Sequence, residues 1–205
     1  MPLAANQLLD AAATRVIPGA VRAVQIDASS PRREEAEQFI RSVFQRHHAA
    51  RVPSFAPELL LIEAQDRVLA AAGWRSAGSQ PLFLERYLDD PVEVLLERLT
   101  GQPLSRERVV EVGHLASEKP GASLHVIVAL ARHLAQLGYE WVVFTATGEL
   151  VRLFTRLGLP LLALAKADPA RLGDEAKAWG RYYDTQPIVV AGRVRLGLER
   201  VGAGA

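Results

Sequence analysis

Apolar residues recur along the chain with two different periods, which predict both strands and helices. The clearest helical pattern begins after Ser30, which we expect to be the N-cap, with Pro31 at the first helical position. Its apolar stripe has the spacing i, i+3, i+4, i+7, i+8 and consists of Ala36, Phe39, Ile40, Val43 and Phe44. Alternating or continuous apolar runs predict strands at residues 21–26, 59–63 and 68–74, with a hairpin turn at 64–67.

The middle of the chain predicts a strand, helix, strand, helix run. Residues 108–117 form the first strand and residues 141–147 the second, and residues 148–157 form a short helix. The helix between the two strands ends at Gly138, and its apolar stripe consists of Leu124, Ile127, Val128, Ala131, Leu134 and Leu137. Strands connected in this way are parallel and joined by right-handed crossovers, which indicates an α/β protein.

The two ends of the chain have weaker patterns. Residues 1–20 are rich in alanine and form either a short helix or a loose arm. Residues 159–165 predict a strand, residues 169–183 a helical or irregular connection, and residues 188–201 a hairpin that turns around Gly192. We expect residues 1–205 to form a single domain, because a chain of this length can enclose one sizeable core.

The segment 81–91 mixes aromatic, acidic and basic residues without one clear period. One interpretation is a partly buried strand that runs into a loop, before a helix that begins at 92 and ends at 99. The other is a segment that covers a substrate, because large apolar groups beside charges suit an amphipathic ligand. On the second interpretation the candidate substrate-binding residues are Phe83, Glu85, Arg86, Tyr87 and Asp89.

Composition narrows the classes of protein. Of the 205 residues, 49% are hydrophobic and 23% charged, and the formal net charge of +1 gives no reason to expect nucleic acid. The sequence contains no cysteine, which excludes disulfides and cysteine nucleophiles and fits a reducing compartment, so we expect a cytoplasmic protein. We identify no signal peptide, and no apolar run approaches the roughly 18 residues of a membrane span.

Glu111 is an acid within the apolar run of the first middle strand, and His114 follows it after Gly113. A solvated second face of the strand would explain such a carboxylate, and so would a functional site. Strict alternation places Glu111 and His114 on opposite faces, whereas a bulge at Gly113 would bring them to one face. We expect no metal site, because adjacent His47 and His48 would point about 100° apart on a helix.

The order of elements is similar to that of the GNAT acyltransferase fold. The chain also resembles the thermostable hemolysin family in four segments, which are 82–89 (LFLERYLD), 110–116 (VEVGHLA), 144–147 (FTAT) and 179–183 (WGRYY). The resemblance implies a three-layer α/β/α architecture with a mixed, partly splayed central sheet. In that fold the strand with Glu111 is central, and it separates near Gly113 from the strand at 141–147 to admit a pantetheine arm.

A more distant resemblance connects the chain to acyl-homoserine-lactone synthases and N-acyl amino acid synthases. In the former, the central strand has the motif Glu-x-x-Arg, which here is Glu111-Val112-Gly113-His114. The arginine, which is always charged, is thus replaced by the shorter histidine, which has no permanent charge. The usual acetyl-CoA loop is also changed, because residues 119–123 (KPGAS) keep a cation and small residues without the glycine pattern. An acyl carrier protein or a long-chain acyl-CoA is therefore as plausible a donor as acetyl-CoA.

These resemblances imply an N-acyltransferase that moves a fatty acyl group from a phosphopantetheine thioester to a small-molecule amine such as an amino acid. Glu111 would be the base and His114 its partner or substitute, with no tightly bound cofactor. The donor-binding candidates are Leu115, Lys119, Gly121, Ala122, Ser123 and Leu124, and Thr145 joins the substrate-binding candidates. The expected partners are the amine acceptor and an acyl carrier protein, and a second copy of the chain in a homodimer is a further possibility. The alternatives are a non-catalytic acyl- or CoA-binding module and a membrane-active hemolysin.

Overall fold

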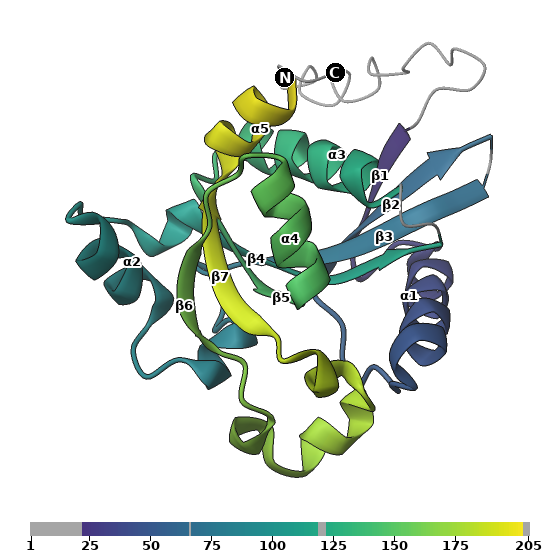
Figure 1. Cartoon of the computed structure of the whole chain (residues 1–205). Coiled ribbons are helices and arrows are strands. Elements are labelled where there is room, and N and C mark those ends of the chain that lie inside the picture. Colours follow the sequence, from purple (N-terminus) through teal and green to yellow (C-terminus); the bar gives the residue numbers. More distant parts are fainter. Residues whose placement is uncertain (1–21, 66, 119–121, 203–205) are drawn as a thin grey trace, which may run out of the picture.

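The computed structural model describes residues 22–65, 67–118 and 122–202, which form a seven-stranded mixed sheet with helices on both faces (Figure 1). The strand order is β1-β2-β3-β4-β5-β7-β6. The strands are β1 Arg22–Ile26, β2 Glu58–Ala64, β3 Arg67–Ser76, β4 Val109–Ser117, β5 Trp141–Ala146, β6 Leu162–Lys166 and β7 Ile188–Arg193. The α-helices are α1 Arg33–His48, α2 Val92–Thr100, α3 Ala122–Gln136, α4 Gly148–Arg156 and α5 Val194–Gly202. Four 3₁₀ segments are η1 Leu84–Tyr87, η2 Arg106–Arg108, η3 Pro169–Trp179 and η4 Tyr182–Thr185.

The middle of the sheet has the predicted parallel pair. β1 to β4 form an antiparallel meander, and β4 then pairs in parallel with β5, with Val109 opposite Trp141 and Val112 opposite Phe144. Among the described residues, β4 beyond Val112 pairs with β3 alone, and β5 beyond Phe144 pairs with β7 alone. The predicted central position, parallel pairing and separation of these two strands near Gly113 are therefore confirmed.

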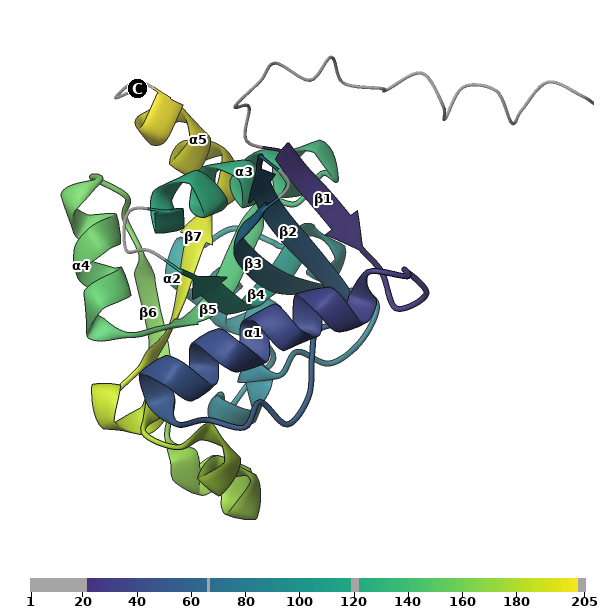
Figure 2. The ribbon, with the colours of Figure 1, turned by 90° about the vertical axis from the view of Figure 1, so that its right-hand side faces the viewer.

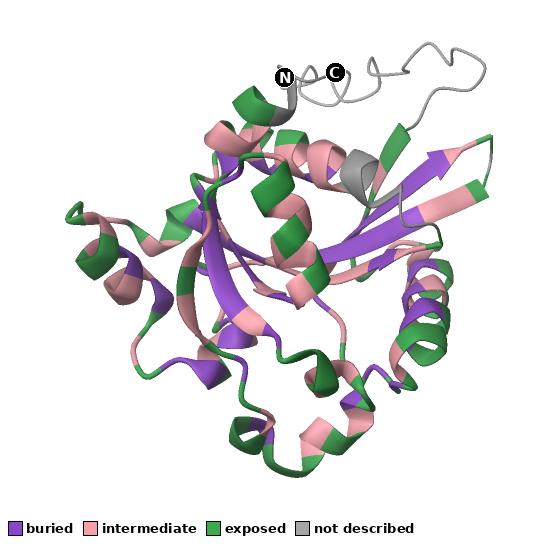
Figure 3. Ribbon diagram, in the orientation of Figure 1, coloured by how far each residue is buried: buried purple, intermediate pink, exposed green. Residues whose placement is uncertain are grey.

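The sheet is the middle of three layers, because alternate residues of its strands pack on different helices. Leu59 and Leu61 of β2 belong to the same core cluster as Ile40 of α1. Leu60 and Ile62, one position on, belong to the cluster of α3 residues that includes Leu130 and Leu134. In Figure 2, α1 lies on one side of β2 and β3 and α3 on the other, and Figure 3 shows that the buried residues follow the strands. The predicted three-layer α/β/α fold is thus confirmed.

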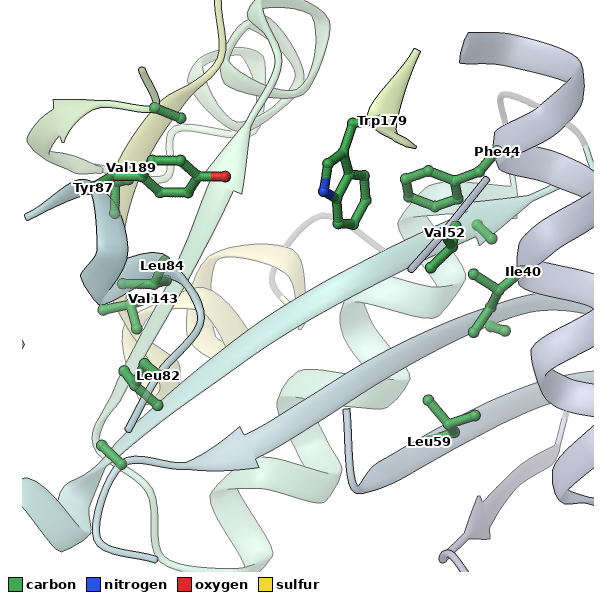
Figure 4. Packing of buried hydrophobic residues seen from close by; sticks show 14 of the residues in the cluster. Ile40, Phe44, Val52, Leu59, Leu82, Leu84, Tyr87, Val143, Trp179 and Val189 are labelled. Carbon is green, nitrogen blue, oxygen red and sulfur yellow. The ribbon is translucent and has the colours of Figure 1, made fainter. Parts of the chain in front are cut away.

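The core on the α1 face, meaning the sheet face that α1 covers, extends the length of the molecule. Figure 4 shows Ile40, Phe44, Val52 and Leu59 at one end and Leu82, Leu84, Tyr87, Val143 and Val189 at the other. Trp179, from the end of η3, lies between the two groups and is 8% exposed. A residue late in the sequence therefore closes the core between the first helix and the segment after β3.

The predicted hairpin at 188–201 is wrong in its second half. β7 is a strand, but residues 194–202 form α5 instead of a returning strand. The reason is topological, because β5 occupies one edge of β7 and β6 occupies the other, which leaves no edge for another strand. α5 packs on α3 instead, and Val194 is buried in the same cluster as Leu130 and Leu134.

Three smaller predictions also need correction. α1 begins at Arg33 and not after Ser30, whose carbonyl accepts a hydrogen bond from Arg33 N at 2.9 Å in the turn before the helix. Within segment 81–91 the structure has the 3₁₀ turn η1 and not a strand. Leu137, just after α3, is 49% exposed, whereas Leu130 of α3, outside the predicted stripe, is 5% exposed because the sheet and α5 cover that side.

Candidate active site

A bulge in β4 brings Glu111 and His114 to the same face of the sheet. Ala71 of β3 pairs with Ala116, but Gly73 pairs with Gly113, so β4 has one extra residue over this interval. His114 has a φ of 54°, the left-handed conformation that bulges often contain. The extra residue reverses the alternation, so both side chains lie on the α1 face. From the sequence, a bulge at Gly113 was one of two alternatives for the relative orientation of Glu111 and His114. The bulge is present, but the residue with the positive φ is His114 and not Gly113.

The glycine that makes room for the His114 ring is Gly73, on the neighbouring strand. A Cβ at Gly73 would lie 3.0 Å from His114 Nδ1 and 2.9 Å from Ala56 Cβ. A Cβ at Gly113 would meet nothing within 4 Å. The imidazole therefore packs directly over the backbone of β3, at a place where any larger residue would displace it.

Glu111 is 7% exposed, and both of its carboxylate oxygens are engaged. Phe83 N donates to Oε2 at 2.7 Å and Leu84 N donates to Oε1 at 3.0 Å, which fixes the start of η1 on the sheet. Arg75 Nε lies 3.3 Å from Oε2. Burial raises the pKa of Glu111 to about 7, although Arg75 and the two backbone donors oppose the increase. The carboxyl group therefore exchanges its proton near neutral pH.

His114 is held as a neutral imidazole. Its Nε2 lies 2.9 Å from the carbonyl oxygen of Ser54, which can only accept, so Nε2 has the proton and Nδ1 the lone pair. Nδ1 is buried and has no hydrogen-bond partner within the described residues. Burial lowers the pKa of His114 to about 4. At neutral pH this side chain is therefore uncharged, unlike the arginine of the Glu-x-x-Arg motif.

Aromatic rings surround His114 on the α1 face. The centroid of Trp179 lies 6.4 Å from that of His114, 6.1 Å from Phe44 and 5.9 Å from Phe83. The ring of Tyr182 in η4 is tilted against Trp179, with the two centroids 5.9 Å apart. Segments before, within and after the central strands thus form one apolar wall beside the two polar groups.

A cavity of about 1240 Å³ opens where β4 and β5 separate. Glu111, His114 and Arg75 line it from the α1 face, and Ile127 and Phe154 line it from the helices on the other face. Because its walls come from both faces of the sheet, the cavity passes between the two diverging strands. Its volume exceeds that of a typical small-molecule site, about 300–1,000 Å³, and suits a long ligand.

The structure brings six of the predicted site residues to this cavity. They are Phe83, Tyr87, Glu111, His114, Leu115 and Thr145. Tyr87 is 3% exposed and its hydroxyl lies 2.5 Å from that of Tyr183. Lys119 and Gly121 lie outside the described residues. Ala122, Ser123 and Leu124 begin α3, but their side chains also lie outside what the structure describes.

Three predicted substrate-binding residues contact other parts of the protein and are not among the residues that line the cavity. Glu85 accepts hydrogen bonds from Leu82 N at 2.9 Å and Val92 N at 3.1 Å, and it pairs with Arg106. Arg86 pairs with Glu175 at 2.7 Å, and Asp89, with a 90% exposed side chain, pairs with Arg171 at 2.7 Å. These contacts fix η1 between α2 and η3, so the prediction of a charged substrate cover is not supported by their positions.

Sequence reasoning missed Arg75, Ser54, Trp179 and Tyr182 as residues of this site. Arg75 pairs across the strands with Glu111, and only the register of β3 on β4 reveals this. Trp179 and Tyr182 belong to the aromatic segment 179–183, which the sequence singled out without giving it a role. No group of three His, Asp or Glu that could hold a metal ion occurs in the described part of the chain.

Comparison with solved structures shows the same fold in three acyltransferases. The acyl-homoserine-lactone synthase LasI has a TM-score of 0.54 and 14% identity, over 87% of this chain and 93% of LasI. FeeM, an N-acyl amino acid synthase from uncultured soil microbes, has a TM-score of 0.58 and 13% identity, over 88% of this chain and 96% of FeeM. BjaI, a CoA-dependent acyl-homoserine lactone synthase whose structure contains SAM and isopentyl-CoA, has a TM-score of 0.61 and 14% identity, over 90% of this chain and 89% of BjaI. At these identities the similarity establishes a GNAT-like fold.

Sequence comparisons give a more specific result. None of the curated proteins compared with the chain matches it significantly. The model of one protein family, described as thermostable hemolysin, matches residues 26–198, which include every strand but the first and the whole of the cavity described above. The chain therefore belongs to the thermostable hemolysin family.

Proposed function

We propose that the protein transfers a fatty acyl group from a phosphopantetheine thioester to the amine of a small molecule. The observation that supports this most strongly is the end of β4–β5 pairing at Val112 and Phe144, which opens the cavity beside Glu111 and His114. Beyond this point the facing edges of the two strands form no ladder with each other in the described part of the chain. The two amides of a pantetheine arm would pair with such edges as an added strand does.

The acyl chain would occupy the apolar part of the cavity. Beyond the separated strands its walls include Ile127, Val128, Phe144, Leu150, Leu153 and Phe154. An apolar chain gains about 0.8 kcal/mol for each methylene that leaves water, so a long chain would bind far more tightly than acetyl. This supports a fatty acyl donor, either acyl-CoA or an acyl carrier protein.

Glu111 would accept the proton of the acceptor ammonium, directly or through one water. Its Oε1 accepts one backbone hydrogen bond and retains a second lone pair, and its pKa of about 7 suits a base at neutral pH. The freed amine attacks the thioester carbonyl, the C–N bond forms and the C–S bond breaks. One amine proton passes to the leaving thiolate, so the products are an amide, a thiol and one proton on the base. His114, neutral and fixed by Ser54, would shape the site or replace Glu111 as base.

The absence of cysteine allows a direct test. A thiol-reactive dye added to the purified protein reports only the thiol that leaves the donor. We expect thiol release that requires both an acyl-CoA or acyl-carrier-protein donor with a chain of about eight or more carbons and an amine acceptor, with the amide identified by mass. Binding of these donors without thiol release, over a broad acceptor panel, would contradict the proposal and favour the non-catalytic acyl-binding alternative.

The family name raises the question of membrane activity. In the described residues, no helix combines the length and the apolar character that a transmembrane span requires.

We also propose that the described fold is a single domain, because its core clusters share one sheet.

A further inference from the structure

In Arg33 and Arg106, two partly buried arginines, every guanidinium nitrogen donates a hydrogen bond. The side chain of Arg33 is 17% exposed and donates to Glu37 at 2.7 Å and to two backbone carbonyls at 2.7 and 2.8 Å. The side chain of Arg106 is 26% exposed and donates to Glu85, to Glu93 and to a backbone carbonyl. A donor left unmatched away from water is costly, so the use of every guanidinium nitrogen is expected in a partly buried arginine.

Arg75 is the exception. Its side chain is 14% exposed, less than either of the other two, yet it makes no hydrogen bond with any residue the structure describes. Its one ion pair places Nε 3.3 Å from Glu111 Oε2, and that oxygen already accepts Phe83 N at 2.7 Å. The guanidinium lines the cavity. A partly buried cation on a cavity wall, with donors that no described residue engages, is well suited to bind an anion.

We propose that Arg75 binds the carboxylate of the acceptor, and that the acceptor is therefore an amino acid. The proposal rests on the proposed acyl transfer and names its acceptor class. Arg75 and Glu111 are direct partners in the β3–β4 register, so their Cβ atoms are about 4.5–5.5 Å apart on one face. An α-amino acid has its ammonium and carboxylate on one carbon. It can therefore present the first to Glu111 and the second to Arg75.

The balance of charge supports the same assignment. Glu111 shares its carboxylate with two backbone donors, and burial keeps part of it protonated near neutral pH. His114 is uncharged, so it adds no competing cation. Arg75 is thus incompletely neutralised, and the planar carboxylate of an amino acid would match its fork of N–H donors with two parallel hydrogen bonds.

A purely structural role for Arg75, in which it only holds Glu111, predicts different kinetics. The discriminating probe is a pair of acceptors, an amino acid and its primary amide, which share the amine and side chain and differ in the carboxylate. The amide changes the pKa of the amine, but this difference is the same for every enzyme variant. The ratio of kcat/KM for the two acceptors, compared between variants, therefore reports the interaction with the carboxylate alone.

The test uses wild type, Arg75→Gln, Arg75→Lys and, as a control, Arg108→Gln, which changes a 53% exposed arginine. Thiol release is measured with one acyl-CoA and with the amino acid and amide forms of one side chain. We expect Arg75→Gln to lower the acid-to-amide ratio by about 10- to 100-fold, the usual scale of a hydrogen bond to a charged group. Arg75→Lys should have an acid-to-amide ratio between those of wild type and Arg75→Gln. Arg108→Gln should have the ratio of wild type.

Each outcome decides the question. Equal losses for both acceptors in Arg75→Gln and Arg75→Lys would overturn the carboxylate site and leave acyl transfer intact. If Arg75→Gln does not fold, Arg75→Lys alone decides. An ammonium cannot reproduce the bidentate contact, so an acid-to-amide ratio of kcat/KM equal to that of wild type would also overturn the carboxylate site. Absence of thiol release from wild type with every acceptor, with both acyl-CoA and acyl-carrier-protein donors, would instead overturn the proposed function, and this inference with it.

Discussion

Replacing Glu111 with glutamine separates its chemical role from its structural role. Gln keeps the size of the side chain but removes the charge and the proton acceptor. If Glu111 is the general base, turnover should fall by about 10²- to 10⁴-fold in folded protein. If it only anchors η1 and Arg75, activity should fall in proportion to unfolded protein.

The structural cost of Glu111→Gln follows from its contacts. Phe83 N and Leu84 N donate to different oxygens of the carboxylate, at 2.7 and 3.0 Å. A glutamine offers one oxygen, so its amino group must face one of these N–H groups and leave it without an acceptor. An unmatched buried donor costs about 1–3 kcal/mol, and the unpaired Arg75 adds to the loss.

The pH dependence of stability gives a second, independent signature of Glu111. Its pKa in the folded protein is about 7, above the ordinary 4.5, so between these values the folded state holds more protons than the unfolded state. The free energy of unfolding contributed by this group is therefore highest below pH 4.5. It falls as pH rises and is lower by about 3 kcal/mol above pH 7. Glu111→Gln should lack this decline.

Two measurements on the same preparations test these expectations. Urea unfolding between pH 4 and 8 gives the stability difference between wild type and Glu111→Gln, and single-turnover thiol release gives the chemical step. A wild-type rate that increases with an apparent pKa near 7, and that Glu111→Gln abolishes, would agree with the base. An unchanged single-turnover rate in folded Glu111→Gln would refute the reasoning and leave His114 as the remaining candidate.

The glycines and the family name give further tests. Gly73→Ala should lower the free energy of unfolding by about 1–3 kcal/mol, because its Cβ would lie 3.0 Å from His114 Nδ1. Gly113→Ala, whose Cβ meets nothing within 4 Å, should leave the urea midpoint nearly unchanged, and equal effects would contradict this packing. Gly180→Ala should lower Tm further, because Gly180 has a φ of 55° and its Cβ would overlap the end of α1; an unchanged Tm would argue against that contact. Purified protein should release no marker from lipid vesicles, because the apolar face of α1 is already buried in the core; release at nanomolar concentration would contradict this.

The sequence determined most of the secondary structure and the class of fold, because these depend on local periodicity. The stripe of α1 needed only the helical spacing of Ile40 and Phe44 to predict a buried face, and both are buried. The parallel β4–β5 pair followed from a strand, helix, strand order, since such crossovers have one handedness. Glu111 attracted attention because a lone acid in an apolar run needs a partner.

Tertiary structure decided the rest, because it depends on which segments become neighbours. The bulge that brings Glu111 and His114 to one face exists only in the register of β4 on β3, and a shift of one residue exchanges the faces of a strand. The occupied edges of β7 turned the expected last strand into α5. Arg75 looks like any strand arginine in the sequence, and only its position beside Glu111 on the cavity wall makes it a candidate binding residue.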